Sequence, residues 1–585
     1  MKQYRTILAV LAAFALAFTT GCQTAEASGT GTTAGTTVSS TDSVDTIVLS
    51  AAADAATQSA ATAGENAYTE RDLDPSYDES EATVVDLSSL TGDYEITAAG
   101  VYVFTGTLAD GQILVNAGED DKVQIVLKGA SITNSDGPAI YAVTADKVFI
   151  TAAEGTVNTL ADGVVYAEDS YGNSPDATVF TKCDLTINGT GSLTIYGNNQ
   201  FGVVGKDDVV VASLTLSITA VMDGIVGKDS VSVSSGTISI TAGDDGISSE
   251  NSDDETLGSV QIDGGTLAIT AAAKGIKAQA SLTVNGGSLT IKAEDDALHG
   301  GTALTVTGGT LHLSSGDDGM HCDDLLVISG GEITVSKSYE GIEAGTITIT
   351  GGTIDVTASD DGLNAAGGSD GDNTQSGRQA DAFAADATKS ILISGGTITV
   401  NADGDGIDSN GSLAVTGGTV FVTGPTDTAN GALDAGTEAT ISGGLVIAAG
   451  SSGMAQTFGT NSTQYSLLYT YQSTQSAGTL ITLTDDSGTV IASFAPVKAY
   501  QSVVISSPEL ENGATYTLYS GGSVSAGVLT GGTEVGSVSL SGVSTTAGSG
   551  AGGSFGGQNQ NDGQMPNNGD MNPGGGQMPG GGGRG

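Results

Sequence analysis

The stretch SLTVNGGSLTIKAEDDALHGGTALTVTGG, residues 281–309, contains one complete unit of a repeat that decides the fold. It combines short runs of alternating apolar and polar residues, a Gly-Gly pair, and an acidic segment that ends in a small residue followed by an apolar one. A fixed period of about 22 residues is typical of a solenoid. The small residue recurs, most often 22 residues apart, at Gly202, Gly224, Gly246, Gly275, Ala297, Gly319, Gly341, Gly362, Gly406 and Ala432.

The pattern inside each unit predicts an all-β fold. Alternating runs such as Leu282–Val284 and Leu289–Ile291 have the period of two that is typical of strands, and Gly-Gly pairs turn the chain between them. Three short strands and three turns in about 22 residues fit one coil of a parallel β-helix, whereas helical repeats are longer and tolerate little glycine. The usual handedness of β crossovers favours right-handed winding. We therefore expect a right-handed parallel β-helix over residues 82–450.

Three further segments break the repeat. Two long steps predict insertions at residues 250–255 (ENSDDE) and 366–386, and insertions leave a solenoid as loops on one face. Residues 451–540 lose the period but keep separated strand-like runs, which predicts a small antiparallel β unit. This unit is expected to cap the β-helix, because an open solenoid end would template aggregation.

The two ends of the chain read as segments outside the β-helix. Residues 1–22 (MKQYRTILAVLAAFALAFTTGC) have a basic start, an apolar centre and a final Gly-Cys pair that looks like a lipobox. They predict a lipoprotein signal peptide with lipidation at Cys22, which would hold the chain on the extracellular face of a bacterial membrane. An ordinary signal peptide and secretion are the alternative. Residues 23–80 are rich in Thr, Ser and Ala and predict a disordered stalk, and residues 541–585 are rich in Gly, Asn, Gln and Pro and predict a disordered tail.

The charge of the chain limits its partners. Asp and Glu outnumber Lys and Arg by 67 to 17, and the formal net charge is −50. Such a charge excludes nucleic acid and anionic lipid surfaces as electrostatic partners. It favours cations, so an acidic partner would need a cation bridge. We expect a monomer whose link to the membrane is the lipid anchor.

The acidic residues are expected to line up in vertical files, because equivalent residues of stacked coils lie about 4.8 Å apart. One file comes directly before the repeating small residue, another precedes that file, and a third lies two residues after the small residue. Neighbouring carboxylates repel by about 1 kcal/mol in water and by several times more in a less polar setting, so a bound cation would stabilise them. Carboxylate and amide oxygens suit Ca²⁺. The predicted calcium ligands are Asp244, Asp245, Asp295, Asp296, Asp317, Asp318, Glu340, Glu343, Asp360, Asp361, Asn364, Asp403, Asp405 and Asp408.

Two groups in these files are the most acidic. One gathers Glu340, Glu343, Asp360, Asp361 and Asn364. The other gathers Asp403, Asp405 and Asp408, with Asp381 or Asp386 reaching over from the insertion. The alternative is that each Asp-Gly pair is turn chemistry alone, because Asp and Gly dominate tight turns.

Four residues depart from an all-acidic ladder. His299 and His321 lie one coil apart in the third file, where with Asp296 and Asp318 they are either transition-metal ligands or polar residues on a wet face. Lys274 and Lys277 interrupt the files in one coil. They either neutralise neighbouring carboxylates or bind a carboxylate of the substrate.

Longer motifs resemble a known family. The segment ITAAGVYVFTGTLADGQILVNAGEDDKVQIVLKGASITNSDGPAIYAVTADKVFITAAEGTVNTLADG, residues 96–163, resembles the opening of an exported bacterial β-helix carbohydrate-binding family known from cellulolytic clostridia. The coils GGTLHLSSGDDGMH and GGTIDVTASDDGLNAAGGSDGDN, and the closing segments SSGMAQTF and YQSVVISSPELENGATYTLYSGG, look like the same family. The resemblance covers residues 82–525. It implies a β-helix related in fold to polysaccharide lyases, with bound Ca²⁺, and binding of acidic pectic polysaccharide and cellulose.

Three functions follow from these observations. The favoured one is a calcium-dependent, non-catalytic module that binds acidic polysaccharide of the polygalacturonate kind, with cellulose as a further candidate, and no catalytic residue is assigned. The absence of Trp argues against a broad aromatic platform for cellulose, although Tyr339 and Phe383 can stack on a sugar. The second is a calcium-dependent pectate-type lyase, for which Lys274, Lys277 and Arg378 are the candidate bases. The third is a structural surface adhesin in which Ca²⁺ only stabilises the coils.

Overall fold

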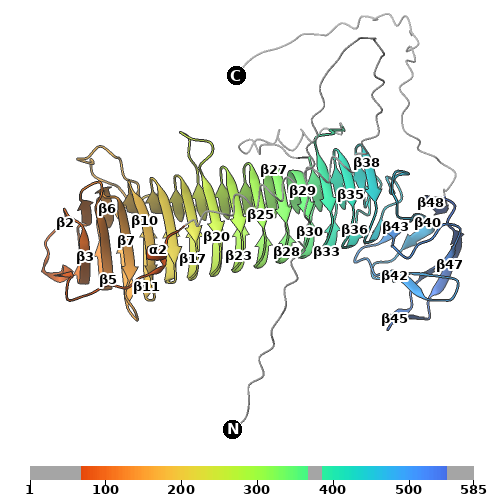
Figure 1. The fold of residues 1–585 in the computed structure, drawn as a ribbon, viewed down its shortest axis with the longest axis horizontal. Coiled ribbons are helices and arrows are strands. Elements are labelled where there is room, and N and C mark those ends of the chain that lie inside the picture. Colours follow the sequence, from red (N-terminus) through yellow and green to blue (C-terminus); the bar gives the residue numbers. More distant parts are fainter. Residues whose placement is uncertain (1–67, 367–384, 550–585) are drawn as a thin grey trace, which may run out of the picture. The chain divides into compact units, whose positions relative to one another are not determined.

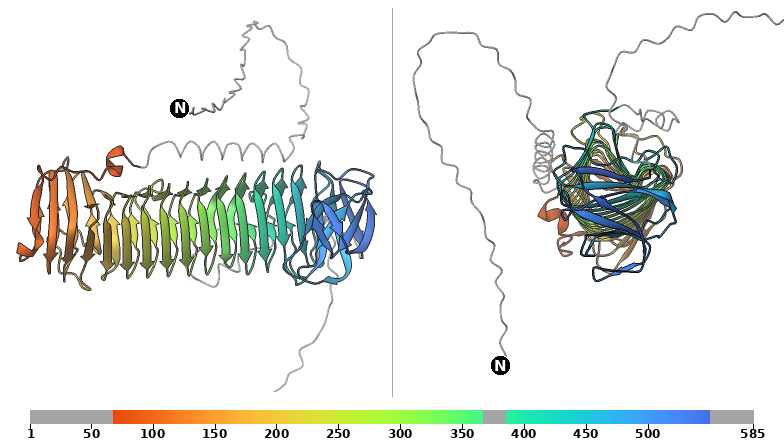
Figure 2. Two further views of the ribbon diagram at one scale, coloured as in Figure 1. Left: turned by 90° about the horizontal axis from the view of Figure 1, so that it is seen from below. Right: turned by 90° about the vertical axis from the view of Figure 1, so that its right-hand side faces the viewer.

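The chain winds into a parallel β-helix. The computed structural model describes residues 68–366 and 385–549. The solenoid has about 15 turns of about 23 residues each, stacked side by side in Figures 1 and 2. The predicted fold and its period are therefore confirmed.

Three walls of short parallel strands enclose the core, and β3, β5, β27 and β29 bend from one wall into another. The first wall consists of β1 (Thr83–Asp86), β3 (Gly100–Leu108), β5 (Lys122–Thr133), β7 (Lys147–Ala152), β10 (Asp184–Gly189), β13 (Asp208–Ala212), β16 (Ser230–Val233), β19 (Ser259–Ile262), β22 (Ser281–Val284), β25 (Ala303–Val306), β27 (Met320–Ile328), β29 (Ile342–Ile349), β32 (Ser390–Ile393), β35 (Ser412–Val415) and β38 (Glu438–Ile441). The second wall continues β3 and β5 with β8 (Val157–Ala161), β11 (Ser192–Gly197), β14 (Thr215–Ala220), β17 (Thr237–Ala242), β20 (Thr266–Ala271), β23 (Ser288–Ala293), β26 (Thr310–Ser314), β28 (Glu332–Lys337), β30 (Thr353–Ala358), β33 (Thr397–Ala402), β36 (Thr419–Thr423) and β39 (Leu445–Gly450). The third wall consists of β2 (Tyr94–Ile96), β4 (Ile113–Asn116), β6 (Ile140–Thr144), β9 (Ala177–Thr181), β12 (Phe201–Gly205), β15 (Ile225–Gly227), β18 (Ile247–Ser249), β21 (Ile276–Ala278), β24 (Leu298–Gly300), the starts of β27 and β29, β31 (Leu363–Ala365), β34 (Ile407–Ser409) and β37 (Asp434–Ala435).

The repeating glycine is required by the narrow core. It enters the third wall, and a Cβ at Gly341 would lie 2.2 Å from Val356 Cγ1 and 2.3 Å from the carbonyl oxygen of Gly362 in the next coil. The same clash would occur along the file, where Gly224 meets Ile240 at 2.4 Å. A β-branched side chain of the second wall therefore fills the space that a Cβ would need.

The two alanines of this file occur where the opposing side chain is not β-branched. Strand register places Leu313 in the file of second-wall residues that face the glycines, at the level of Ala297. At the level of Ala432 the same register places Ala448. The exceptions in the glycine repeat therefore follow from close packing, in which small and large residues compensate across the core.

An N-terminal segment of residues 68–81, which we call the strap, lies against the outside of the coils. Its short helix α2 (Glu70–Leu73) carries the buried Asp72, which forms an ion pair with Lys147 Nζ (2.8 Å) and accepts a hydrogen bond from Thr186 Oγ1 (2.5 Å). The Tyr68 hydroxyl donates to Asp263 Oδ2 (2.7 Å), a residue 195 positions later in the chain. Figure 2 shows α2 outside the stack of coils. Residues 68–80 therefore belong to the packed part of the chain, and the predicted stalk boundary at residue 80 is corrected, because buried polar pairing fixes the strap.

The C-terminal unit continues from the last coil. Strand β43 (Tyr500–Ser506) pairs antiparallel with both β39 and β40 (Ser466–Gln475), so the parallel order ends there. The unit also contains a four-stranded antiparallel sheet of β42 (Val490–Phe494), β41 (Ile481–Thr484), β44 (Thr515–Ser520) and β47 (Thr533–Ser539), and a hairpin of β45 (Ser523–Ser525) and β46 (Val528–Thr530). The predicted antiparallel unit is confirmed. Its end is corrected, because β48 (Ser544–Gly548) pairs with β40 inside the stretch predicted as tail.

The other segments predicted outside the β-helix are described only in part. The signal peptide with Cys22 and most of the longer insertion, including Arg378, Asp381 and Phe383, lie outside the described residues. The short 3-10 helix η1 (Leu87–Ser89) follows β1. Within residues 68–366 and 385–549, we find no helix of the length and apolarity needed to cross a membrane.

Candidate metal-binding ladder

The third file of the sequence analysis forms a continuous ladder along the third wall. Strand register pairs each member with the next, coil by coil, with no slip. The successive members are Val204, Val226, Ser248, Lys277, His299, His321, Glu343, Asn364, Asp408 and Asp434. The order predicted from spacing is therefore confirmed.

The acidic file before the glycine has a structural task as well as a charge. Asp245 Oδ1 accepts the backbone N–H of Lys274 in the next coil (2.8 Å), and Asp296 Oδ1 accepts that of Asp318 (3.1 Å). Asp361 Oδ1 accepts the N–H of Asp405 in the same way (2.5 Å). These hydrogen bonds run to the next coil rather than within one turn, so one oxygen of each of these carboxylates joins neighbouring coils. The second oxygen faces the ladder.

In five coils the second oxygen meets a hydrogen-bond donor or a cation. The Ser248 hydroxyl donates to Asp223 Oδ2 (2.7 Å), and Asn364 Nδ2 donates to Glu340 Oε2 (2.7 Å). The other three contacts are Lys277 Nζ to Asp245 Oδ2 (3.9 Å), His299 Nδ1 to Asp296 Oδ2 (2.9 Å) and His321 Nδ1 to Asp318 Oδ2 (2.9 Å). Each of these five carboxylates therefore has a donor or cation of the chain beside its second oxygen, while burial still raises the pKa of Asp245 to about 7.

Further along, the ladder residue is itself an acid. One oxygen of each of Asp361, Asp405 and Asp408 lies within 4.8 Å of the others. Burial, reinforced by Asp405 and Asp408, raises the pKa of Asp361 to about 8, and burial also raises the pKa of Asp405 to about 6. We call these three residues the carboxylate triad.

A buried amide oxygen adjoins the triad. Asn364 is 1% exposed, and Asn364 Oδ1 has no hydrogen-bond partner among the described residues. Its amide nitrogen points toward Glu340 in the preceding coil, so the oxygen faces the other way, and the ladder neighbour there is Asp408. A buried acceptor without a donor is costly. Carboxylates and an amide oxygen without a donor form the donor set that a hard cation needs.

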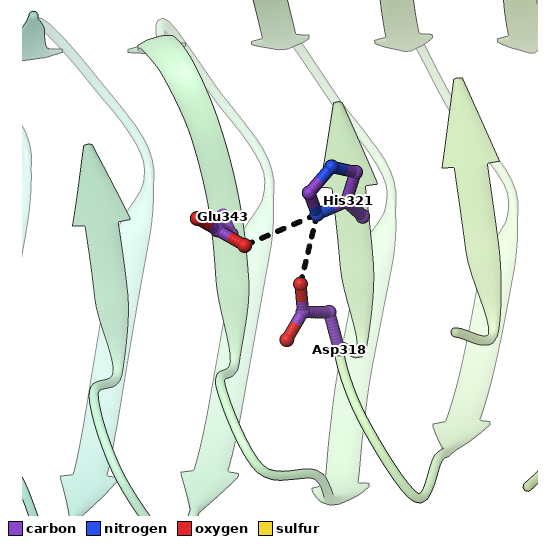
Figure 3. Close-up of side chains that lie close together, drawn as sticks. All are labelled: Asp318, His321 and Glu343. Atoms are coloured by element: carbon purple, nitrogen blue, oxygen red, sulfur yellow. Dashed lines mark hydrogen bonds and ion pairs between the residues drawn. The ribbon is translucent and has the colours of Figure 1, made fainter. Parts of the chain in front are cut away.

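A second candidate centre contains nitrogen. His321 is fully buried, and its Nδ1 lies 2.9 Å from Asp318 Oδ2 and 3.1 Å from Glu343 Oε2 of the next coil, as Figure 3 shows. His321 Nε2 lies 3.3 Å from Asp323 Oδ1. Burial lowers the pKa of His321, but hydrogen bonds to these three carboxylates outweigh it and raise that pKa well above its usual value.

In the preceding coil, a lysine occupies the space between the carboxylates. Lys274 Nζ pairs with Asp296 and lies 3.2 Å from Asp295 Oδ2. Burial raises the pKa of Asp296, but the hydrogen bond from His299 and the charge of Lys274 together hold it below its usual value. The His299 ring stacks on His321 at 4.9 Å between centroids, and burial lowers the pKa of His299.

Other predicted ligands are placed less favourably. Asp403 pairs with Lys498 of the C-terminal unit (2.9 Å), so the structure groups Asp361 rather than Asp403 with Asp405 and Asp408. Asp386 Oδ1 accepts hydrogen bonds from Thr388, whose hydroxyl lies 2.7 Å away. The remaining predicted residues lie along the ladder: Asp244 beside Asp245, Asp317 with Asp295 and Asp296 in one group, and Asp360 next to Asp361.

Sequence reasoning missed an acidic group at the N-terminal ends of β10 and β13 in the first wall. Oxygens of Asp184, Asp207 and Asp208 lie within 4.8 Å of one another. Burial and the charges of Asp184 and Asp208 raise the pKa of Asp207 to about 6. The recurring Lys-Asp pairs at 206–207 and 228–229, 22 residues apart, carry the signal that would have found it.

A parallel β-helix with ordered acidic ladders is a solenoid that presents a long, repetitive surface. Residues 91–341 match a family model described as carbohydrate-binding domain-containing protein. A protein of the same description from Acetivibrio thermocellus is 37% identical over 135 residues, which is 23% of this chain and 47% of the relative. The predicted resemblance to a carbohydrate-binding β-helix family is confirmed, and the chain spans about half the length of this relative.

A solved structure is also similar in sequence. It is the polysaccharide lyase-like protein from C. thermocellum, in a gadolinium derivative, at 31% identity over 42% of this chain and 96% of that one. The TM-score is 0.36, so the superposition adds no argument about the site.

Proposed function

We propose that this protein is a non-catalytic carbohydrate-binding protein that holds acidic, pectic polysaccharide through Ca²⁺ at the carboxylate triad. The observation that carries the proposal is the change of ladder chemistry. Five coils supply a donor or cation to the second oxygen of the acidic file, whereas at Asp361, Asp405 and Asp408 the facing group is another carboxylate.

Calcium fits this donor set better than smaller ions do. Ca²⁺ accepts six to eight oxygen ligands with flexible geometry. The triad and Asn364 Oδ1 provide four side chains with oxygen donors, so further positions stay open for water or for oxygens of a uronate. The cation would then bridge two anions, which explains how a chain of net charge −50 binds an acidic glycan.

The proposal leaves out catalysis, because the two candidate bases among the described residues, Lys274 and Lys277, are engaged. Lys277 pairs with Glu250, whose hydrogen bond outweighs the effect of burial and raises the lysine pKa above its usual value. Lys274 pairs with Asp295 and Asp296. A charged, ion-paired ammonium is a poor general base. Both lysines therefore act as neutralising charges.

The setting of the site completes the proposal. We place the protein as a monomer on the extracellular face of a bacterial membrane, anchored through Cys22, with secretion as the alternative. Cellulose is a second candidate glycan.

The test is affinity electrophoresis of the purified chain in gels that contain polygalacturonate, with Ca²⁺ or with a chelator. We expect strong retardation with Ca²⁺ and little with the chelator. Asp405→Asn should abolish most of the retardation, whereas Glu332→Gln, which makes the same charge change at an exposed position of β28, should not.

Each other outcome contradicts the proposal in its own way. Retardation that is as strong with chelator as with Ca²⁺ would show that no cation bridge is needed. A Ca²⁺-dependent rise in melting temperature without retardation on any polysaccharide supports the adhesin. Sustained ultraviolet absorbance of an unsaturated product supports the lyase.

A further inference from the structure

We infer that Asp318, His321 and Glu343 form a separate site for a divalent transition metal such as Zn²⁺, distinct from the calcium site at the triad. The three residues belong to two consecutive coils: Asp318 and His321 flank the start of β27, and Glu343 lies at the start of β29. A metal held there would join the two coils. Figure 3 shows the three side chains converging.

The first argument is the donor set. Imidazole suits Zn²⁺, Cu²⁺, Fe²⁺ and Ni²⁺, whereas Ca²⁺ and Mg²⁺ prefer oxygen alone. A single imidazole nitrogen, His321 Nδ1, faces both carboxylates at 2.9 and 3.1 Å. That nitrogen carries at most one proton, so it cannot make two full hydrogen bonds at once. A metal ion in place of that proton would contact the imidazole nitrogen and both carboxylates.

The second argument is the spacing of the ligand atoms. Bond lengths of about 2.0–2.2 Å place neighbouring ligand atoms about 3 to 3.5 Å apart around a zinc ion. The separations of 2.9 and 3.1 Å therefore need only a small outward movement to admit the ion.

The third argument is the orientation of the imidazole. Metal-binding histidines usually donate their other ring N–H to a carboxylate, which fixes the ring and its tautomer. His321 Nε2 lies 3.3 Å from Oδ1 of Asp323. Asp323 is not one of the three proposed ligands, so its carboxylate is available to orient the ring. A metal that displaces the Nδ1 proton leaves the other proton on Nε2, facing Asp323, and binds the Nδ1 lone pair. Glu343 is partly exposed, which gives the ion a route in.

The preceding coil supplies a natural comparison. It has the same Asp-x-x-His arrangement in Asp296 and His299, but there Lys274 occupies the position of the cation. The next ladder residue is also His321 rather than an acid. That layer is complete without a metal, so His299 serves as the matched control for His321.

The test uses Co²⁺ as the probe on the purified full chain, with excess Ca²⁺ to fill oxygen-only sites. We expect one Co²⁺ per chain, with visible d–d absorption that Zn²⁺ displaces. His321→Gln should weaken Co²⁺ binding by about 100-fold or more, and Asp323→Asn by about 10–100-fold, the usual loss for an orienting group. His299→Gln should change the affinity by less than about threefold.

Three results would overturn the inference: no stoichiometric Co²⁺, unchanged affinity in His321→Gln, or an equal loss in His299→Gln. Circular dichroism checks folding. If His321→Gln does not fold, Glu343→Gln and Asp323→Asn carry the same test at partly exposed positions. The outcome is separable from the proposed function, because His321→Gln should leave calcium-dependent retardation on polygalacturonate intact, whereas Asp405→Asn should leave Co²⁺ binding intact.

Discussion

The carboxylate triad predicts that the protein without Ca²⁺ loses stability as the pH rises. The pKa of Asp361 is raised from 3.8 to about 8 in the folded chain. Between about pH 4 and pH 8 the Asp361 carboxyl therefore binds more protons in the folded chain than in the unfolded chain. The free energy of unfolding consequently falls as the pH rises through this window. The contribution is complete below about pH 4 and is lost as the pH passes 8.

The size of this loss follows from the shift. About four pKa units correspond to an upper limit of about 6 kcal/mol at pH 9, since each unit is worth about 1.4 kcal/mol. The triad is partly solvated, and an effective dielectric near 20 reduces such energies, so we expect about half of that value. Asp405, with a pKa raised to about 6, adds to the loss at lower pH.

The assay is thermal unfolding by calorimetry from pH 5 to 9, in chelator and in Ca²⁺. In chelator the melting temperature should fall with pH, and Ca²⁺ should restore it most at high pH. Asp361→Asn keeps the size of the side chain and removes the charge, so it should stabilise the chelated protein at pH 9 and flatten the pH dependence. Glu332→Gln is the charge-matched control. A melting temperature in chelator that is flat or rises with pH, or Asp361→Asn that destabilises at pH 9, would refute the reasoning.

Three further predictions concern packing, the strap and a thiol. Gly341→Ala should lower the free energy of unfolding by about 2–3 kcal/mol, because its Cβ would overlap Val356 and a backbone oxygen. Adding Val356→Ala to the same chain should recover part of this loss, as urea titrations can measure. Asp72→Ala should cost about 3 kcal/mol, because it removes the nearest partner of the buried Lys147 and leaves only Asp184, 3.8 Å from Lys147 Nζ. It should also expose the strap to limited proteolysis, which an unchanged cleavage pattern would contradict. Burial raises the pKa of Cys322 to about 11, so this thiol should resist alkylation at pH 8 until the chain unfolds, as peptide mass mapping can measure.

The sequence was sufficient for the features that repeat. The nearly constant spacing of Gly319, Gly341 and Gly362, at 22 and 21 residues, sets the coil, and strand register keeps the residues at a fixed offset from them in one ladder. Even the exceptions are readable, since Ala297 coincides with a Leu rather than a β-branched residue across the core. Periodicity therefore predicts which residues stack.

Periodicity could not predict how each carboxylate uses its two oxygens. That depends on backbone N–H groups in the next coil and on partners that break the period. Lys498 pairs with Asp403, which lies 95 residues earlier in the chain. Lys147 of the first wall pairs with Asp72 of the strap. The strap carries no repeat, so composition alone classed it with the stalk. Such pairs arise from tertiary contact, which local patterns do not encode.

The strap also constrains the order in which the chain folds. Solenoid coils can form one after another, because each contacts only its neighbours. The strap is different, since Tyr68 bonds to Asp263 across 195 residues. During synthesis, residues 68–81 emerge long before that partner exists, so the Tyr68 contact can close only after the coil containing β19 has been made. The strap, although made early, is thus among the last segments to be secured, and its docking reports that the coils it crosses have assembled.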